Sequence, residues 1–382
     1  KFIVKSEEIE SQVLVYTEIP FEYDYLDVLQ IEGKLKKPEN FSDFNYRKYL
    51  KDRNISYISY YPKLKKIGTY RDKNWYFTWK YQFFSLREKI KNKLETYLLE
   101  PHNSISQAFF LSDKSLLSQK METKFRRAGL SHVLVVSGLH ISVLIYLLFK
   151  VFNFLKPKTK KILVLIILLA YLFLLNFPAS ATRAGLMFYL FLIFKDKYKA
   201  IYSLGISLAI LLVIDPTWLL RDLSLSLSVL AVLGIILILP ILKRVNKKNI
   251  VLNYIIQTIL ISLSINLVIG PFILYHFGEF SLVGVISNLL VVFVLPFLVS
   301  SLILALVSPV FSEFFFFIVY LLLEYLIAIV NFFSKFEVLK YNLGWEELSL
   351  IYIILAYGFF FLLFLRLRII YYEMLLSLSK AR

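Results

Sequence analysis

The sequence contains no cysteine, which excludes disulfide bonds, thiolate metal ligands and a cysteine nucleophile. Charge is scarce as well: charged residues make up 19 %, whereas hydrophobic residues make up 58 % and the mean hydropathy is +0.66. A soluble domain contains about 25 % charged residues. One soluble core could not bury 35 Phe and 26 Tyr behind so little polar surface. The composition therefore indicates a membrane protein.

Several motifs are also absent. The sequence has no G-x-x-x-x-G-K-[ST] loop, so no nucleotide-binding site of the P-loop type is expected. The 4 His and the few carboxylates of the apolar segments form no H-E-x-x-H pair, so neither a metal nor another cofactor is expected. The two halves of the apolar part show no internal repeat, which argues against the alternative of a small-molecule transporter. The first residue is Lys1, so we expect the chain to be a fragment.

The composition changes near residue 131. Residues 1–131 carry a net charge of +7 and no apolar run long enough to span a membrane. Residues 132–382 carry a net charge of +10 and are dominated by apolar runs. We therefore expect a β domain at 1–78, amphipathic interfacial helices at 79–131 and a helical membrane bundle at 132–382.

Alternating Val, Ile, Tyr and Leu residues in the first part predict β-strands at Gln12–Tyr16, Leu26–Leu35 and Ile55–Tyr61. The pattern suggests a small barrel or sandwich, with a short helical insert at Phe44–Asp52. Apolar residues three to four apart then predict amphipathic helices at the membrane surface, from Trp79 to Leu99 and from Ser104 to Leu130.

Nine apolar segments follow and predict a mostly α, polytopic membrane bundle. They are 132–153, 162–178, 183–194, 200–214, 222–241, 250–272, 282–309, 312–334 and 348–366. A span needs about 17–25 apolar residues. The short segments 183–194 and 200–214 are therefore expected to be half-helices or tilted pieces inside the bundle.

Positive charge alternates between the loops of this bundle. One set of loops, together with the C-terminus, holds 16 Lys and Arg residues, whereas the opposite loops hold Arg221, Lys335 and Lys340. Positively charged loops remain in the cytoplasm. The pattern thus predicts a cytoplasmic C-terminus and an extracytoplasmic location for residues 1–131.

Polar side chains inside apolar segments are costly and often functional. The most informative are His132, Ser137 and His140 in SHVLVVSGLHIS, Arg183 in SATRAGLM, Asp222 in DPTWLLRDLSLSLSVLAVLG, His276 in GPFILYHFG and Asn288 in GVISNLLVVFVL. On one continuous helix His140 would lie within about 80° of both His132 and Ser137. By the predicted topology all of them lie in the outer half of the bundle, which suggests a wet cavity that opens outward.

These residues also have structural interpretations. Serine in a membrane helix usually packs, Arg183 could snorkel to the outer boundary, and His276 could belong to an interfacial belt. Ser137 and His140 invite a nucleophile–base interpretation and thus an intramembrane hydrolase. No Asp or Glu in their segment would orient the imidazole, so an enzyme is not expected.

Together these residues resemble the ComEC competence protein family. Phe125–Leu144 (FRRAGLSHVLVVSGLHISVL) is similar, almost position for position, to the family signature F-x-x-x-G-L-x-H-L-L-x-V-S-G-L-H-[VI]. Thr182–Met187 resembles the R-A-x-x-M element, and Asp222–Ile235 resembles the D-x-G-F-x-L-S-F-x-A-V-x-G-I helix. Tyr275–Leu290 resembles the Y-H-F-G…N-L-L pair.

In the first part, Gly33–Pro38 and Asn40–Leu50 are similar to the extracytoplasmic OB-like domain of the family. OB folds combine cationic and aromatic side chains on one face to bind single strands. The residues that suggest a weak DNA-binding surface of this kind are Lys34, Lys36, Lys37, Arg47, Tyr46 and Tyr49. Strand packing is the alternative role for the tyrosines of this domain, which also include Tyr57, Tyr60 and Tyr61.

Three departures from the family pattern matter. Ser224-Leu225-Ser226 replaces the usual Gly-Phe-Gln triplet, and the proline that usually follows N-L-L closely appears only at Pro296. No metallo-β-lactamase-like domain follows Arg382. The chain is therefore expected to be a short form without the nuclease of longer members, or a piece of such a member.

The resemblance implies an inner-membrane channel that passes single-stranded DNA into the cytoplasm during natural transformation. The residues that would line or gate the path are His132, Ser137, His140, Arg183, Asp222, His276 and Asn288. Arg183 would contact phosphate or pair with Asp222. The implied partners are single-stranded DNA, membrane lipid, a periplasmic or surface DNA receptor and a cytoplasmic helicase-like ATPase, since no motor is encoded here.

Overall fold

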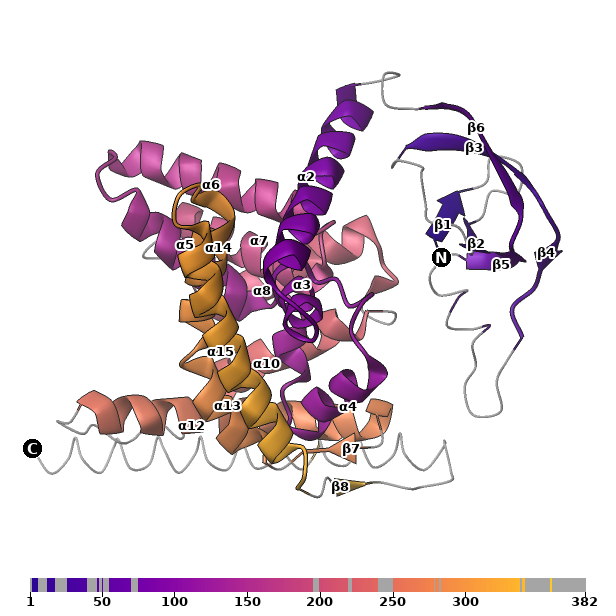
Figure 1. Cartoon of the computed structure of the whole chain (residues 1–382). Coiled ribbons are helices and arrows are strands. Elements are labelled where there is room, and N and C mark those ends of the chain that lie inside the picture. Colours follow the sequence, from indigo (N-terminus) through magenta and orange to yellow (C-terminus); the bar gives the residue numbers. More distant parts are fainter. Residues whose placement is uncertain are drawn as a thin grey trace, which may run out of the picture. The chain divides into compact units, whose positions relative to one another are not determined.

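A computed structural model describes residues 2–5, 12–17, 26–39, 47, 50, 55–69, 75–194, 199–218, 222–239, 250–277, 279–281, 283–336, 339–340 and 358. The chain divides into two compact units, Lys1–Glu88 and Lys89–Arg382 (Figure 1). The finer division of the chain at residues 78 and 131 stays a prediction.

The first unit contains two small sheets. One has the order β1-β2-β5-β4, made of Phe2–Lys5, Gln12–Tyr16, Ile55–Tyr60 and Leu35–Lys36, and the other pairs β3 (Asp27–Glu32) with β6 (Lys63–Thr69). The predicted strands at 12–16 and 55–61 are confirmed, and the one at 26–35 divides into β3 and β4 around a bend at Gly33. Of the predicted insert, only the helical residues Arg47 and Leu50 are among the described residues.

The first unit has its own apolar core. Val13, Leu14 and Val15 of β2 are all buried, because β2 lies between β1 and β5 and pairs in parallel with β5. Leu14 packs with Ile58 and the other members of a small buried cluster. The unit is thus a small β domain, and its OB-like topology stays a prediction.

The second unit is helical. Its elements are α2 (Trp75–Tyr97, which begins in the first unit), α3 (His102–Leu111), α4 (Gln119–Arg127), the 3₁₀ turn η1 (Ser131–Leu134), α5 (Gly138–Val151), α6 (Pro157–Leu174), α7 (Ala179–Phe194), α8 (Ala200–Ile214), α10 (Leu223–Leu237), α12 (Ile250–Phe277), α13 (Gly284–Val292), α14 (Leu295–Val307) and α15 (Ser312–Phe333). The two-residue strands β7 (Glu279–Phe280) and β8 (Leu339–Lys340) pair with each other. Within this unit α14 lies beside α15, and α5 packs against α7 and α14 (Figure 1).

Eight of the nine predicted apolar segments contain helices, and the ninth, 348–366, lies outside the described residues apart from residue 358. Two stretches of the described chain are long and apolar enough to cross a membrane, Ile256–His276 and Ser312–Phe333. The bent pair α13 and α14, with an angle of 44°, forms a third if it is one broken span. The mostly α fold is confirmed, and the number of nine spans stays a prediction.

The prediction for residues 104–130 differs from the structure in one respect. The expected surface helix is divided into α3 and α4, and all ten residues of α3 are buried, so α3 does not lie at an interface. Its apolar residues Ile105, Ala108 and Phe109 join the main core, which is completed by α14 and α15. Only α4 keeps an exposed charged face. Tertiary packing thus overrides the amphipathic pattern of α3.

Candidate functional site

The signature segment, Phe125–Leu144, begins with a tightly wound helix end. The Leu130 N–H donates to the Phe125 carbonyl at 2.8 Å and the Gly129 N–H donates to the Arg126 carbonyl at 3.0 Å. Gly129 has a left-handed backbone, with φ of +73°. This is the Schellman arrangement, for which glycine is the preferred residue. The end of α4 therefore has a fixed geometry.

Helix α13 docks on this turn. A Cβ atom at Gly129 would lie 2.5 Å from the Gly284 Cα, so the two backbones are in direct contact. The hydroxyls of Ser281 and Ser287 donate to the carbonyls of Arg127 and Ala128, at 2.5 and 2.6 Å. Small residues permit this close approach, and the serines satisfy carbonyls that the end of α4 leaves free.

His132 and Asn288 meet beside this contact. His132, in η1, is exposed and interacts with the Asn288 side chain and the Gly129 backbone. The Asn288 amide donates to the Ser262 hydroxyl of α12 at 3.3 Å, and the Asn266 amide donates to the Ser262 carbonyl at 2.9 Å. A row of polar groups therefore crosses η1, α13 and α12.

Ser137 and His140 form a helix cap. The expectation that His132, Ser137 and His140 share one helical face is wrong, because α5 begins at Gly138 and Ser137 is its N-cap, with extended backbone. His140 Nδ1 accepts the Ser137 N–H at 3.2 Å and lies 3.0 Å from the Ser137 hydroxyl. His140 is buried, and its Nε2 atom has no hydrogen-bond partner among the described residues. The pair is thus a capping box in which histidine takes the usual place of glutamate.

Helices α3 and α7 hold the middle of the signature segment. The Ser112 hydroxyl accepts the Val136 N–H at 2.9 Å, and the Ser180 hydroxyl donates to the Val136 carbonyl at 3.2 Å. The Phe109 ring meets the His140 ring edge-on, with centroids 4.4 Å apart. The segment is therefore a junction between α3, α7 and α13.

Arg183 lies in the interior, so the snorkelling interpretation is wrong. Its side chain is 3 % exposed, and Nη1 donates to the Ser228 carbonyl of α10 at 3.3 Å. Its Nη2 atom lies against Gly138, at 3.3 Å from where a Cβ would be. Arg183 thereby joins α7 to both α5 and α10.

Asp222 and His276 have local contacts. The Asp222 carboxylate accepts the Ser224 N–H at 2.9 Å and caps the N-terminus of α10. Arg221, the neighbouring cation, lies outside the described residues. The exposed His276 ring lies 4.3 Å from Phe272 and 4.8 Å from Tyr275 of its own helix. A place for His276 in an interfacial belt or in the path stays a prediction.

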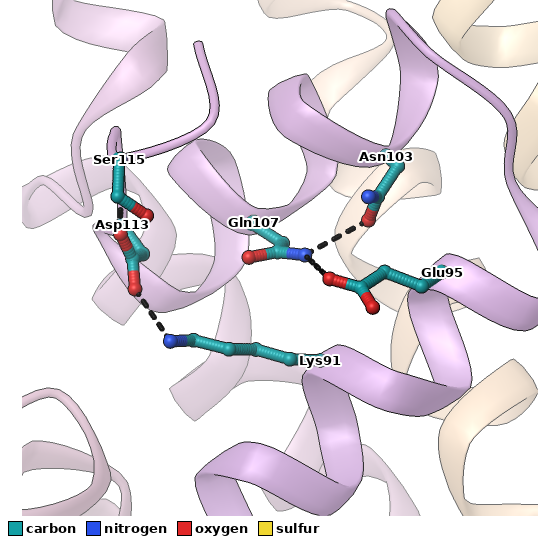
Figure 2. A network of polar contacts seen from close by, with 6 residues as sticks. All are labelled: Lys91, Glu95, Asn103, Gln107, Asp113 and Ser115. Carbon is teal, nitrogen blue, oxygen red and sulfur yellow. Dashed lines mark hydrogen bonds and ion pairs between the residues drawn. The ribbon is translucent and has the colours of Figure 1, made fainter. Parts of the chain in front are cut away.

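A second polar cluster joins α2 to α3 and was not predicted from the sequence. Figure 2 shows the ion pair between Lys91 and Asp113, at 2.8 Å, beside the Gln107 amide, which donates to Asn103 at 2.9 Å and to Glu95 at 3.4 Å. Burial by itself would raise the pKa of Asp113. The hydrogen bonds from Lys91 and Ser115 outweigh it, and they hold this pKa well below its usual value. The carboxylate therefore remains charged at every physiological pH.

The first unit presents cationic and aromatic side chains together. Lys34, Lys36, Lys37 and Arg47 are exposed, as predicted for a binding surface, whereas Tyr46 and Tyr49 lie outside the described residues. Two tyrosines for which strand packing was the alternative role are also exposed: Tyr60 by 49 % and Tyr61 by 60 %.

These tyrosines lie beside the lysines. The Lys36 Nζ atom lies 6.0 Å from the centre of the Tyr60 ring, which stacks on Tyr16 at 5.0 Å. A Cβ atom at Gly33 would lie 2.7 Å from the Pro62 Cβ, so the turns that carry Lys34 and Tyr61 touch. Tyr60 thus packs on the neighbouring strand through Tyr16 and is still half exposed, and Tyr61 is exposed as well.

The described residues contain no group of three or more His, Asp or Glu side chains that could hold a metal ion. The chemistry available in the second unit is instead that of fixed hydrogen-bond donors and acceptors around the signature segment. Such an arrangement can position a polar ligand or hold helices in one packing.

The sequence was compared with known proteins and families. The sequence model described as "Competence protein" matches residues 109–369, which is more than half of the chain. ComE operon protein 3 of Bacillus subtilis (strain 168) is 26 % identical over 300 residues, covering 75 % of this chain and 37 % of that protein. The chain thus spans little more than a third of the length of this relative. No solved structure matches the chain. The matched region includes every contact described around the signature segment, and because the model covers more than half of the chain, the chain belongs to the competence protein family.

Proposed function

We propose that this chain forms the membrane channel through which single-stranded DNA enters the cytoplasm during natural transformation. The first unit would lie on the outer face of the bacterial inner membrane and the C-terminus in the cytoplasm. Membership of the competence protein family supports the role, and the alternation of positively charged loops supports the orientation.

The observation that carries this proposal is the polar row beside the signature segment. Hydrocarbon cannot accept phosphate, so a strand needs an enclosed polar route through the bundle. The exposed His132, followed by Asn288, Ser262 and Asn266, supplies hydrogen-bonding groups across three elements. These groups also join helices to one another, but each is costly in lipid, and a polar route through the bundle is a second use for them.

The same proposal gives Arg183 the role of holding a closed state. Its guanidinium is buried between α5, α7 and α10, so a strand reaches it only if these helices separate. Asp222 would stabilise the start of α10 in that state, and Ser137 with His140 would stabilise the start of α5. His276 would lie at the outer rim.

The proposed partners follow from the proposed route. A DNA receptor outside the membrane would deliver the strand, and a cytoplasmic helicase-like ATPase would pull it, since the sequence has no P-loop. Membrane lipid would surround the apolar helices.

A transformation assay on a strain without the gene for this chain tests the proposal. We expect labelled DNA to reach the periplasm of that strain but not its cytoplasm, and we expect the restored gene to return cytoplasmic DNA. A small-molecule transporter would instead leave DNA uptake intact and change the accumulation of a solute. Cytoplasmic DNA at the parental amount in the deletion strain would refute the channel.

The first unit is proposed to capture the strand with Tyr60 and Tyr61. Stacking of one base on an aromatic ring contributes about 1–3 kcal/mol, so each Tyr→Ala change should weaken binding by roughly 5- to 150-fold. Fluorescence anisotropy with labelled oligodeoxythymidine and the full chain in detergent measures this. Tyr60→Phe and Tyr61→Phe should retain binding, and Tyr202→Ala, at an exposed ring of α8, should have no effect. Parental affinity in Tyr60→Ala/Tyr61→Ala would remove these residues from the site.

A further inference from the structure

Two pairs of polar residues in the signature segment are exposed between residues that are fully buried. Phe125, Ala128, Leu130, Val133 and Leu134 are all 0 % exposed. The residues between them that remain accessible are Arg126, Arg127, Ser131 and His132. We refer to these four as the basic strip. The motif alone did not distinguish its two arginines from its core positions.

The backbone under the basic strip is held from several sides. The Schellman turn fixes Arg126 and Arg127 relative to Ser131, and Gly129 contacts Gly284 directly. Ser281 binds the carbonyl of Arg127 itself. Lys124, a further cation of the last turn of α4, is already bound to Asn331 at 2.6 Å. The arginines of the basic strip are thus carried by a preorganised support, and both residues are exposed on it.

The chemistry of the basic strip suits a phosphodiester. A guanidinium presents a planar fork of N–H groups that matches two phosphate oxygens, and hydroxyl and imidazole groups add single hydrogen bonds. Arginine near a helix C-terminus is also stabilised by the helix dipole.

The position of the basic strip favours a polymer over a single headgroup. Its last member, His132, is the first member of the row that continues through Asn288 and Ser262 to α12. A strand with regularly spaced phosphates can bind the arginines and extend along that row. A lipid headgroup is a single group and would not extend along the row of polar side chains.

We propose that the basic strip binds the phosphates of single-stranded DNA at the start of its route through the bundle. This inference rests on the proposed function and names a contact site within it. The site is separate from the tyrosine surface of the first unit, because it reads backbone charge, whereas Tyr60 and Tyr61 stack bases.

The absence of cysteine makes a direct test possible. Ser131→Cys places one thiol in the basic strip of an otherwise cysteine-free chain, and Lys158→Cys places a control thiol on the exposed start of α6. With the full chain in nanodiscs of zwitterionic lipid, we expect single-stranded oligodeoxythymidine to slow maleimide labelling at position 131 but not at position 158. Adding Arg126→Gln/Arg127→Gln to Ser131→Cys should abolish the protection.

Salt dependence provides a second readout. Each phosphate contact with a single strand contributes about 0.7 to the slope of log K against log salt, so Arg126→Gln/Arg127→Gln should lower that slope by ~1.4. Lys156→Gln/Lys158→Gln removes the same charge from α6 and should change the slope less.

Three outcomes would overturn the proposal that the basic strip binds DNA. The first is maleimide labelling of Ser131→Cys that is not slowed at DNA concentrations that saturate binding. The second is an unchanged salt slope in the folded Arg126→Gln/Arg127→Gln variant, and the third is slower labelling with anionic lipid in the absence of DNA. The deletion-strain assay is scored separately. Protection at position 131 without any transformation defect in the deletion strain would refute the proposed channel and leave the binding site intact.

Discussion

Gly129→Ala is expected to remove most of the folded protein. Two costs add at this position. A left-handed backbone with a Cβ costs about 1–2 kcal/mol, and φ here is +73°. The new Cβ would also lie 2.5 Å from the Gly284 Cα, so α13 must move and the Ser281 and Ser287 hydrogen bonds must break. We expect the free energy of unfolding to fall by more than ~4 kcal/mol. Single substitutions reach such values only through defects such as backbone strain and overpacking, which are combined here.

Two matched variants are expected to lose less stability than Gly129→Ala. Gly284→Ala would place its Cβ 3.3 Å from the Gly129 Cα, so a smaller loss is expected. At Gly205 of α8 a Cβ meets nothing within 4 Å, so Gly205→Ala should be neutral or stabilising by up to about 1 kcal/mol. Thermal unfolding in detergent, followed by size-exclusion chromatography, measures all three. Gly129→Ala within 1 kcal/mol of the parent would mean that the contact with α13 is not tight.

Arg183→Met is expected to abolish DNA uptake without loss of stability. Burying a charged guanidinium carries a desolvation penalty of several kcal/mol, which offsets much of what its hydrogen bonds contribute. Arg183 therefore contributes little net stability from its bond to the Ser228 carbonyl. What the substitution removes is the guanidinium that a strand would contact once α5, α7 and α10 separate, so uptake should fail at that step. Arg183→Ala should abolish uptake as well, with membrane insertion intact.

Three measurements separate this role from others. Transformation frequency should fall to background while the amount of chain in the membrane fraction and its unfolding midpoint stay at parental values. Arg183→Lys should also fail, because an ammonium lacks the planar fork. Tyr189→Ala, at an exposed ring of the same helix, is the control. The salt slope of DNA binding should not change in Arg183→Met, unlike in the basic-strip variant. Normal transformation would remove Arg183 from the proposed route.

The sequence was sufficient for most helices and for the signature, because both depend on local patterns. Apolar runs produced helices at nearly every expected place, and Phe125–Leu144 proved to be the junction of the second unit. The break before α5 was missed because Val133 to Val136 are as apolar as a helix interior. Ser137 and His140 did contain a signal, since a serine followed three residues later by a hydrogen-bonding side chain resembles a capping box.

Burial was the part that local patterns could not supply. The apolar helices are hydrophobic around most of their circumference, so sequence alone does not show which face meets protein and which meets lipid. For the same reason the sequence did not show that Arg183 is buried among other helices. Arg126 and Arg127 were passed over because charge at the end of an amphipathic helix is common, and only their exposed place beside buried neighbours distinguishes them.

The burial of α3 has a consequence for biosynthesis. Several partners of α2, α3 and α4 are synthesised much later: Lys93 binds the carbonyl of Leu306, 213 residues on, and Lys124 binds Asn331, 207 residues on. His102 Nε2 lies 3.0 Å from a carboxylate oxygen of Glu324 of α15. Contacts between distant parts of a chain form slowly, and until they form the segments remain uncovered. We therefore expect the contacts of α3 with α15 to form only after α15 has been synthesised. The earliest helices of this unit would then be among the last to reach their final positions.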